Sequence, residues 1–513
     1  MRLARVLGVV GRLLRMFSPG FAVPLLLGTY DGFYGGETAG NAAGVGRTLT
    51  ASGWNGAWDG GFPFLAGGII TWVAGFILSR GLKGDEGFRR SEAFGIVGFS
   101  WLFVALFGAI PYLLEGLSTV DAWFESMSGF TTTGATILTN FESHTRAFFL
   151  WRGMSQWIGG LGVIALFVVV LPQLRIGGRQ LFFAEASSGV PGEVISPKIQ
   201  ESARRLWILY GFLTVLVITL LHVVAKLPLF DALCHGLTTV SAGGFSPHPG
   251  SVGGYANPTA EWILIPFMLI AGISFPLLWV VFSRKPLEFF RDGELRFYLL
   301  SAGIGAAGIA WILTSKGIPG EAEIRPALFQ AASLSTGTGY ASADYVHWAS
   351  GAKVLLIAVM LVGGCAGSAA GGAKAVRNLL TLKFLRREIT RALHPRAVLP
   401  LTHKGQPVPE EAMRGIVHLV TLYLAGYVFF GTLVALTAQV DLVSSFSAAL
   451  ACLGNIGPAF GSLGPMGNYA DLPSVTKLIL AGTMWLGRLE IVTLLALLHP
   501  HVWTRLRWHG NRE

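Results

Sequence analysis

The feature that most constrains this sequence is a short glycine-ended segment that recurs four times between long apolar stretches. The copies are rich in small uncharged residues and occupy residues 128–136, 236–245, 333–340 and 452–458. A single segment of this kind would be a weak turn signal. Four copies in the same surroundings indicate an internal repeat, so the chain is expected to fold as four related units.

A second landmark lies at the same distance before the final glycine of each copy. The residues at this position are Asp121, Asp231, Pro326 and Ser444. All three residue types are common where a helix starts. Each repeat is therefore predicted to contain a short helix of about three turns that leads into an extended, glycine-ended piece of backbone.

The composition places these repeats in a membrane. Hydrophobic residues make up 52% of the 513 residues and charged residues only 13%, with a mean hydropathy of +0.58. A soluble domain carries about 25% charge, so a soluble fold is excluded. The three cysteines have no ligand-like spacing, which argues against a disulfide framework and a zinc site.

Apolar spans near the 20 residues needed to cross a bilayer flank each glycine segment. The expected pairs are 94–114 with 148–171, 206–224 with 262–282, 297–313 with 354–380, and 416–436 with 474–498. Two further spans, at about 1–30 and 61–78, precede the first repeat, and ten spans are predicted in all. The basic N-terminus lacks a convincing signal-peptide cleavage site, so the first span is expected to be retained.

The predicted fold is thus an all-α membrane protein of four membrane–loop–membrane repeats and an N-terminal two-helix addition. The boundaries are 1–90 for the addition and 91–175, 200–285, 292–385 and 410–500 for the repeats.

The distribution of Lys and Arg along the sequence predicts the orientation of the chain in the membrane. Most of the 38 basic residues fall in segments that share the side of the N-terminus, which the positive-inside rule assigns to the cytoplasm. Both termini are therefore expected inside, in the cytoplasm, and the four glycine segments outside. Because the basic residues alternate by loop and do not gather on one face, nucleic acid is not an expected partner.

The glycine segments are expected to line an ion path. Four such segments can form a ring of backbone carbonyls that replaces the water shell of a dehydrated cation. The residues predicted to contribute carbonyls are Thr132, Thr133, Gly134, Ala242, Gly243, Gly244, Gly337, Thr338, Gly339, Asn455, Ile456 and Gly457.

A candidate gate lies in the third repeat. A glycine-rich stretch interrupts its second span, and irregular backbone at membrane depth is tolerated only where protein buries it or a cavity lines it. Arg488 is expected at the same depth, where an unpaired arginine costs about 3 kcal/mol. The predicted gate comprises Gly363, Gly364, Gly367, Ser368, Gly371, Gly372 and Arg488. The alternatives are a packing kink in the span and a purely structural arginine.

Four motifs resemble the TrkH/KtrB family of potassium transporters: the set of four glycine segments, the run 156–162, and the stretches 363–372 and 487–490. The resemblance implies that the four repeats are arranged with pseudo-fourfold symmetry in a bacterial inner membrane. The two added helices resemble the TrkH branch. The resemblance implies a homodimer, a cytosolic nucleotide-binding regulatory subunit (TrkA), and K+ selectivity from the glycines that end all four segments. The sequence departs from the family pattern at Ala369 and Ala370, where relatives commonly have Thr and Gly. This departure lies in the candidate gate and therefore bears on the details of gating.

Other classes remain as alternatives. An alternating-access symporter coupled to protons or sodium would have broken helices and midplane sites. A membrane enzyme would need a polar catalytic set, and no carboxylate pair, nucleophile with its base, or metal cluster stands out in the sequence. No catalytic residue or cofactor is predicted beyond the transported K+. Arg152 is expected near the outer end of its span, with its guanidinium reaching toward water.

Overall fold

The computed structural model describes residues 2–34, 54–81, 90–165, 199–282, 286–314, 317–397, 399–404, 406–489 and 497. Within these ranges the chain is helical except for turns and one small antiparallel hairpin of β1 (Thr402–His403) and β2 (Gln406–Pro407). The predicted all-α class is confirmed. Glu490, and the basic residues expected at 175–198 and after 500, lie outside the described residues.

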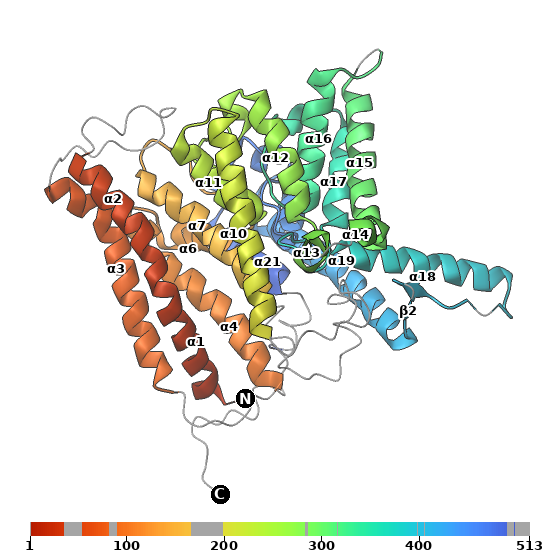
Figure 1. Ribbon diagram of the computed structural model, residues 1–513, viewed down its shortest axis with the longest axis horizontal. Coiled ribbons are helices and arrows are strands. Elements are labelled where there is room, and N and C mark those ends of the chain that lie inside the picture. The colour runs from red at the N-terminus through yellow and green to blue at the C-terminus, as the bar shows by residue number, and fades with distance from the viewer. Residues whose placement is uncertain are drawn as a thin grey trace, which may run out of the picture.

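The N-terminal addition is a helical hairpin packed through glycine. A short 3-10 turn joins α1 (Leu3–Phe17) to α2 (Ala22–Tyr34), and α3 (Trp54–Ser79) runs back along both (Figure 1). A Cβ on Gly28 or Gly32 would come much closer to the α3 backbone than the 3.0 Å that real Cβ atoms keep. Glycine therefore lets the two backbones touch, as is common between membrane helices.

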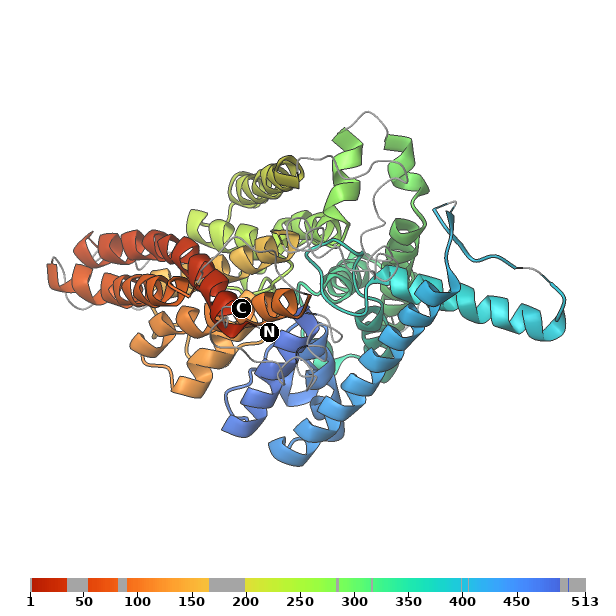
Figure 2. The same cartoon turned by 90° about the horizontal axis from the view of Figure 1, so that it is seen from below.

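The four repeats follow one another around a common centre, which is clearest in the view from below (Figure 2). The first repeat contains α4 (Arg90–Gly108), α5 (Ile110–Leu114), α6 (Thr119–Phe130) and α7 (Arg146–Ala165). The second contains α10 (Ile199–Val223), α11 (Leu229–Val240), α12 (Pro258–Ala271) and α13 (Phe275–Phe282). The third contains α14 (Pro286–Arg291), α15 (Gly293–Leu313), α16 (Glu321–Thr336), α17 (Ser350–Val362) and α18 (Ala375–Leu393). The fourth contains α19 (Glu410–Ala438), α20 (Leu442–Leu453) and α21 (Ser474–Leu489).

We call α6, α11, α16 and α20 the central helices. Three of them are 12 residues long, as the three-turn prediction requires, and α16 has 16 residues. Ser118 and Asp441 cap α6 and α20, so Asp121 and Ser444 lie in the first turn of these helices, as Asp231 does in α11. Pro326 lies inside α16, so the start of this helix differs from the prediction. The longer α16 begins earlier because Glu323 accepts a hydrogen bond from the backbone N–H of Gly320.

Six helical segments of the described chain are long and apolar enough to cross a membrane, and one bent pair would make a seventh. The other three predicted spans correspond to α7, α17 and α21, whose described parts are shorter or less apolar. Residues 166–171, 490–496 and 498 of the predicted spans lie outside the described residues. The bent pair corrects the prediction of a continuous span at 262–282. Here the helix axis bends by 108° between α12 and α13, across Gly272, Ile273 and Ser274.

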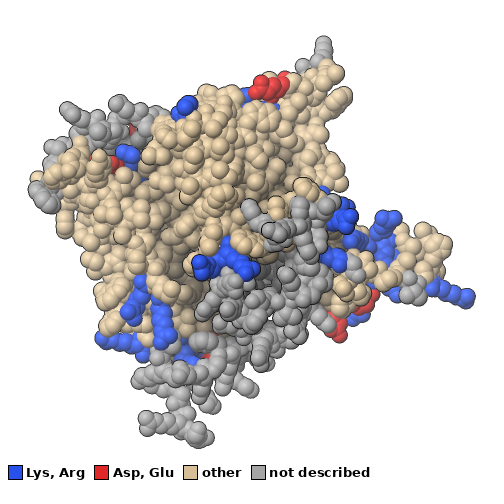
Figure 3. All heavy atoms as spheres, viewed as in Figure 1, with Lys and Arg blue, Asp and Glu red and all other residues tan. Residues whose placement is uncertain are grey.

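Charge is distributed unevenly over the molecule. In the space-filling view, Lys and Arg gather along the lower margin and on the projecting helix α18, whereas the middle of this face is almost free of charge (Figure 3). The described N-terminal end of α1 lies at the same lower margin (Figure 1). A charge-free belt between polar margins suits a chain that spans a bilayer.

Candidate functional site

All four central helices end in the same backbone motif. The residue two positions before each final glycine has a left-handed conformation, at Thr132 (φ 52°), Ala242 (φ 52°), Gly337 (φ 72°) and Asn455 (φ 51°). The following N–H bonds the carbonyl five residues back in every copy, for example Thr133 to Ser128 at 2.8 Å. These are the bonds of a Schellman helix end, which explains why three residues other than glycine adopt a positive φ here.

The final glycines adopt a second left-handed conformation just beyond this cap. Their φ values are 83° at Gly134, 80° at Gly244, 78° at Gly339 and 99° at Gly457. Since only glycine adopts such angles at little cost, the backbone itself requires glycine at these positions. We call residues 132–134, 242–244, 337–339 and 455–457 the glycine segments.

The glycine segments form a closed ring. A Cβ placed on each final glycine would lie no more than 2.5 Å from a carbonyl oxygen of the next repeat. The pairs run in one cyclic order: Gly134 meets Gly243, Gly244 meets Thr338, Gly339 meets Ile456, and Gly457 meets Thr133. The structure therefore brings all twelve predicted residues together around one axis.

Side chains from outside the segments hold this ring. The amide nitrogen of Gln156 on α7 donates to the carbonyl of Gly243 (2.6 Å), and its oxygen accepts from the N–H of Phe245 (3.0 Å). The amide of Asn455 donates to the hydroxyl of Thr133 (3.0 Å) and to the carbonyl of Met484 (2.9 Å). Asn455 therefore acts through its side chain as well as its backbone, which the sequence did not predict.

The predicted gate stretch is a loop between α17 and α18. Gly363, Gly367 and Gly372 have positive φ values of 70°, 75° and 84°, so the chain turns repeatedly without helical bonding. A Cβ on Gly371 would collide with the carbonyl of Gly454, at the end of the fourth central helix. The loop therefore packs directly against the base of the ring.

The same loop explains the bend between α12 and α13. The N–H of Cys365 bonds the carbonyl of Gly272 (2.8 Å), and the N–H of Phe275 bonds the carbonyl of Gly367 (3.0 Å). These bonds satisfy backbone groups that a continuous helix would have paired internally. The interrupted helices of two neighbouring repeats thus satisfy each other's free backbone groups.

Arg488 reaches this loop from the fourth repeat. Its guanidinium donates to the carbonyl of Ala369 (3.0 Å) and to the carbonyl of Gly159 on α7 (3.3 Å), and the residue is 8% exposed. Lys374, which the sequence analysis did not single out, donates to the carbonyl of Ala370 (3.0 Å). Two basic side chains therefore bind adjacent carbonyls of one loop.

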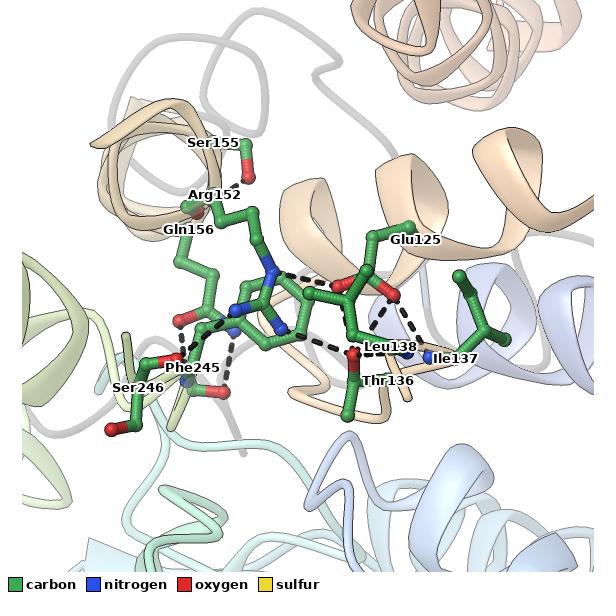
Figure 4. A network of polar contacts seen from close by, with 10 residues as sticks. Glu125, Thr136, Ile137, Leu138, Arg152, Ser155, Gln156, Phe245 and Ser246 are labelled. Atoms are coloured by element: carbon green, nitrogen blue, oxygen red, sulfur yellow. Dashed lines mark hydrogen bonds and ion pairs between the residues drawn. The ribbon is translucent and has the colours of Figure 1, made fainter. Parts of the chain in front are cut away.

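The expectation for Arg152 is wrong. Its side chain is 2% exposed and forms a buried ion pair with Glu125 on α6, with 2.7 Å between Nε and Oε1 (Figure 4). The helix α7 carries Arg152 and Gln156 one turn apart. Two strongly polar residues at this spacing in an apolar stretch are a signal that both face protein partners and not lipid.

Comparison with known proteins agrees with this arrangement. The family model TrkH, described as a cation transport protein, matches residues 62–501. The Trk system potassium uptake protein TrkH of Halomonas elongata is 35% identical over 98% of this chain and 100% of its own length. The TrkG protein of Escherichia coli K12 is 35% identical over 85% of this chain and 91% of its own. A crystal structure of the potassium transporter TrkH from Vibrio parahaemolyticus aligns with a TM-score of 0.83 at 29% identity, covering 98% and 100% of the two chains.

Proposed function

The chain belongs to the TrkH family of cation transport proteins, and we propose that it takes up potassium ions across the bacterial inner membrane through the ring of glycine segments. The family predicted from the sequence is thereby confirmed, and it is a family of transporters. The apolar helices of the described chain agree with a multi-pass membrane protein. The similarity to Trk potassium uptake proteins over nearly the whole chain supports K+ as the transported ion.

The observation that carries the proposal is the cyclic contact of each final glycine with a carbonyl of the next repeat. A dehydrated cation on this axis would meet backbone oxygens from all four repeats, which can replace its water shell. The left-handed glycines let the four segments approach closely enough to do so.

The gate would consist of the loop at 363–372 and Arg488. The loop packs against the base of the ring, and Arg488 bonds its Ala369 carbonyl. Both would therefore lie on the path of an ion that leaves the ring toward the loop. A fixed positive charge at that point repels a cation in a medium of low dielectric constant. Conduction would require the Arg488 bond to break and the loop to move about its glycines.

Control from the cytoplasm would act through α18, which continues directly from the loop and projects sideways from the rest of the molecule, below α15 (Figure 1). Its exposed apolar side chains recur along one stripe, at Leu382, Leu385, Ile389 and Leu393. Such a stripe suits protein contact. It supports the expected homodimer and the TrkA-like regulatory subunit. The basic lower margin supports a cytoplasmic location for this side.

One observation favours a second candidate, a cation symporter with alternating access. The α12–α13 bend and the α17–α18 break both interrupt apolar helical stretches, a feature common in such carriers. A symporter would accumulate K+ in proportion to an imposed proton or sodium gradient. A channel-like protein would let K+ follow its own electrochemical gradient alone.

The test is K+ flux into proteoliposomes, with Na+, Rb+ and choline as competitors, measured with and without imposed proton and sodium gradients. We expect K+ and Rb+ to compete and choline to have no effect. Equal transport of Na+ and K+ would contradict potassium selectivity, and no cation flux from inserted protein would contradict the transport proposal.

A further inference from the structure

A second ring of bonds surrounds the glycine segments on the side where the chain leaves them. In every repeat, the carbonyl two residues after the final glycine accepts a hydrogen bond from the preceding repeat. The bonds are Arg152 Nη1 to Ser246 O (3.1 Å), Gly253 N to Ala341 O (2.9 Å), Tyr345 Oη to Ala459 O (3.1 Å) and Tyr469 N to Thr136 O (2.8 Å). We call these four bonds the collar.

The collar closes in the same cyclic order as the glycine ring. The first repeat donates to a carbonyl of the second, the second donates to the third, the third donates to the fourth, and the fourth donates to the first. Each glycine segment is therefore held at both ends, by the Schellman cap of its central helix and by its collar carbonyl. A strand fixed at both ends keeps its position when the ion between the strands changes.

The joint between the first and second repeats differs from the other three, because its donor is a charged side chain. The guanidinium of Arg152 donates from all three nitrogens: Nε to Glu125, Nη2 to the Thr136 hydroxyl (3.1 Å) and Nη1 to the Ser246 carbonyl (Figure 4). Thr136 and Ser246 are both two residues beyond their final glycine. One side chain thus binds the equivalent positions of two neighbouring repeats.

Glu125 fixes the other side of this guanidinium. Its carboxylate also accepts from the hydroxyl of Thr136 (3.1 Å) and from the N–H of Ile137 (3.0 Å), and the residue is fully buried. The ring of Phe245 lies 4.0 Å from the guanidinium carbon. Burying such a pair costs desolvation and gives little net stability, so its value lies in the geometry that it imposes.

We propose that Arg152, oriented by Glu125, is a positioning residue that sets the spacing of the first and second glycine segments and thereby the preference for K+ over Na+. The inference deepens the proposed function and rests on it. A ring held open at the spacing of K+ cannot close around the smaller Na+, whereas a ring with one loosened joint can. Gln156 is one turn away and holds Gly243, so Arg152 and Gln156 secure the second segment on both sides of Gly244.

The test replaces both charges together, by Arg152→Met with Glu125→Gln, so that no buried charge is left unpaired. K+ and Na+ uptake are measured on the same proteoliposomes, and their ratio cancels the amount of inserted protein. We expect the ratio to fall about tenfold, the scale of losing a charge-assisted hydrogen bond. Arg152→Lys, which keeps the charge but not the three-way geometry, should give an intermediate ratio. A purely structural role would lower both fluxes equally, and an unchanged ratio would overturn the proposal.

A second variant keeps the test decisive if the double variant does not insert. Tyr345→Phe removes a single neutral donor from the joint between the third and fourth repeats, and we expect a fall of about threefold in the ratio. The control is Tyr423→Phe, whose buried hydroxyl has no hydrogen-bond partner among the described residues. Equal ratios of K+ to Na+ uptake in Tyr345→Phe and in the control would refute the role of the collar bonds in ion selectivity. A parent protein that does not distinguish K+ from Na+ would refute the proposed function instead.

Discussion

The guanidinium of Arg488 donates a hydrogen bond to the carbonyl of Ala369 across 3.0 Å, although 119 positions separate the two residues. This bond joins the last helix of the fourth repeat to the loop of the third. It also places a positive charge within a few residues of Gly371, which packs on the base of the glycine ring. The relationship makes the gate hypothesis specific enough to test by substitution.

Removing the Arg488 charge should raise K+ flux. Arg488→Ala deletes both the bond to Ala369 and the barrier to cations, and deleting residues 369–371 shortens the loop. We expect a rise of about tenfold or more in proteoliposome flux and less dependence on a cytosolic regulator, whereas Arg488→Lys should stay near the parent because it keeps the charge. If both the alanine and the deletion variants insert normally yet conduct no better, Arg488 is structural.

Side chains at the final glycines should weaken ion discrimination. Gly134→Ser and Gly339→Ser would force a left-handed backbone on serine and push its Cβ against a carbonyl of the next repeat. We expect a several-fold loss of K+ preference over Na+ in competition assays. Gly211→Ser is the matched control, since a Cβ there meets nothing within 4 Å. Unchanged selectivity in both ring variants would remove these glycines from the ion path.

Asn455 should matter through its side chain. Asn455→Ala loses the bonds to Thr133 and Met484 and also places alanine at a positive φ, whereas Asn455→Gly loses only the bonds. Thermal unfolding in detergent should show the alanine variant less stable than the glycine variant by about 1 kcal/mol, and both less stable than the parent. Parent-like stability in the glycine variant would mean that the amide bonds contribute nothing.

The expected topology can be checked by labelling. Tags at both termini should be reached only from the cytoplasm, and a cysteine at the exposed position Pro249 only from outside. The three native cysteines are buried, so their background labelling should be low. Labelling of either terminus from outside intact cells would reverse the orientation.

The β1–β2 hairpin should respond to pH. Burial, with a smaller effect from nearby Lys404, lowers the pKa of His403 to about 4. The folded hairpin thus prefers neutral histidine, so its stabilisation is complete above about pH 6.5 and is lost as the pH falls toward 4. Hydrogen exchange of residues 399–409 should rise over that window in the parent and stay flat in His403→Gln. The same rise in both proteins would exclude His403 as the cause.

Local sequence patterns were enough to predict the central features. The glycine segments, the short helices before them and the interruption at residue 363 depend on residues close together in the chain. An arginine in an apolar span was also expected to need a partner, and Arg488 donates to the carbonyl of Ala369 in the loop between α17 and α18.

Features stabilised from a distance could not be predicted in this way. The apolar run through Gly272 looks like a continuous span, and it bends because Cys365 and Gly367 of the next repeat bond its free backbone groups. Arg152 looks like a residue that reaches toward water until the fold places Glu125 beside it. In both cases the deciding partner comes from another helix.

Because the four quarters of the ring are encoded by one chain, each can diverge on its own. The collar shows this already, since its donors are an arginine, a tyrosine hydroxyl and two backbone amides. In an assembly of four identical subunits, one codon change would alter every quarter at once. Here it alters a single quarter, so evolution or engineering can adjust ion preference in small steps without ever exposing the whole ring to the same defect.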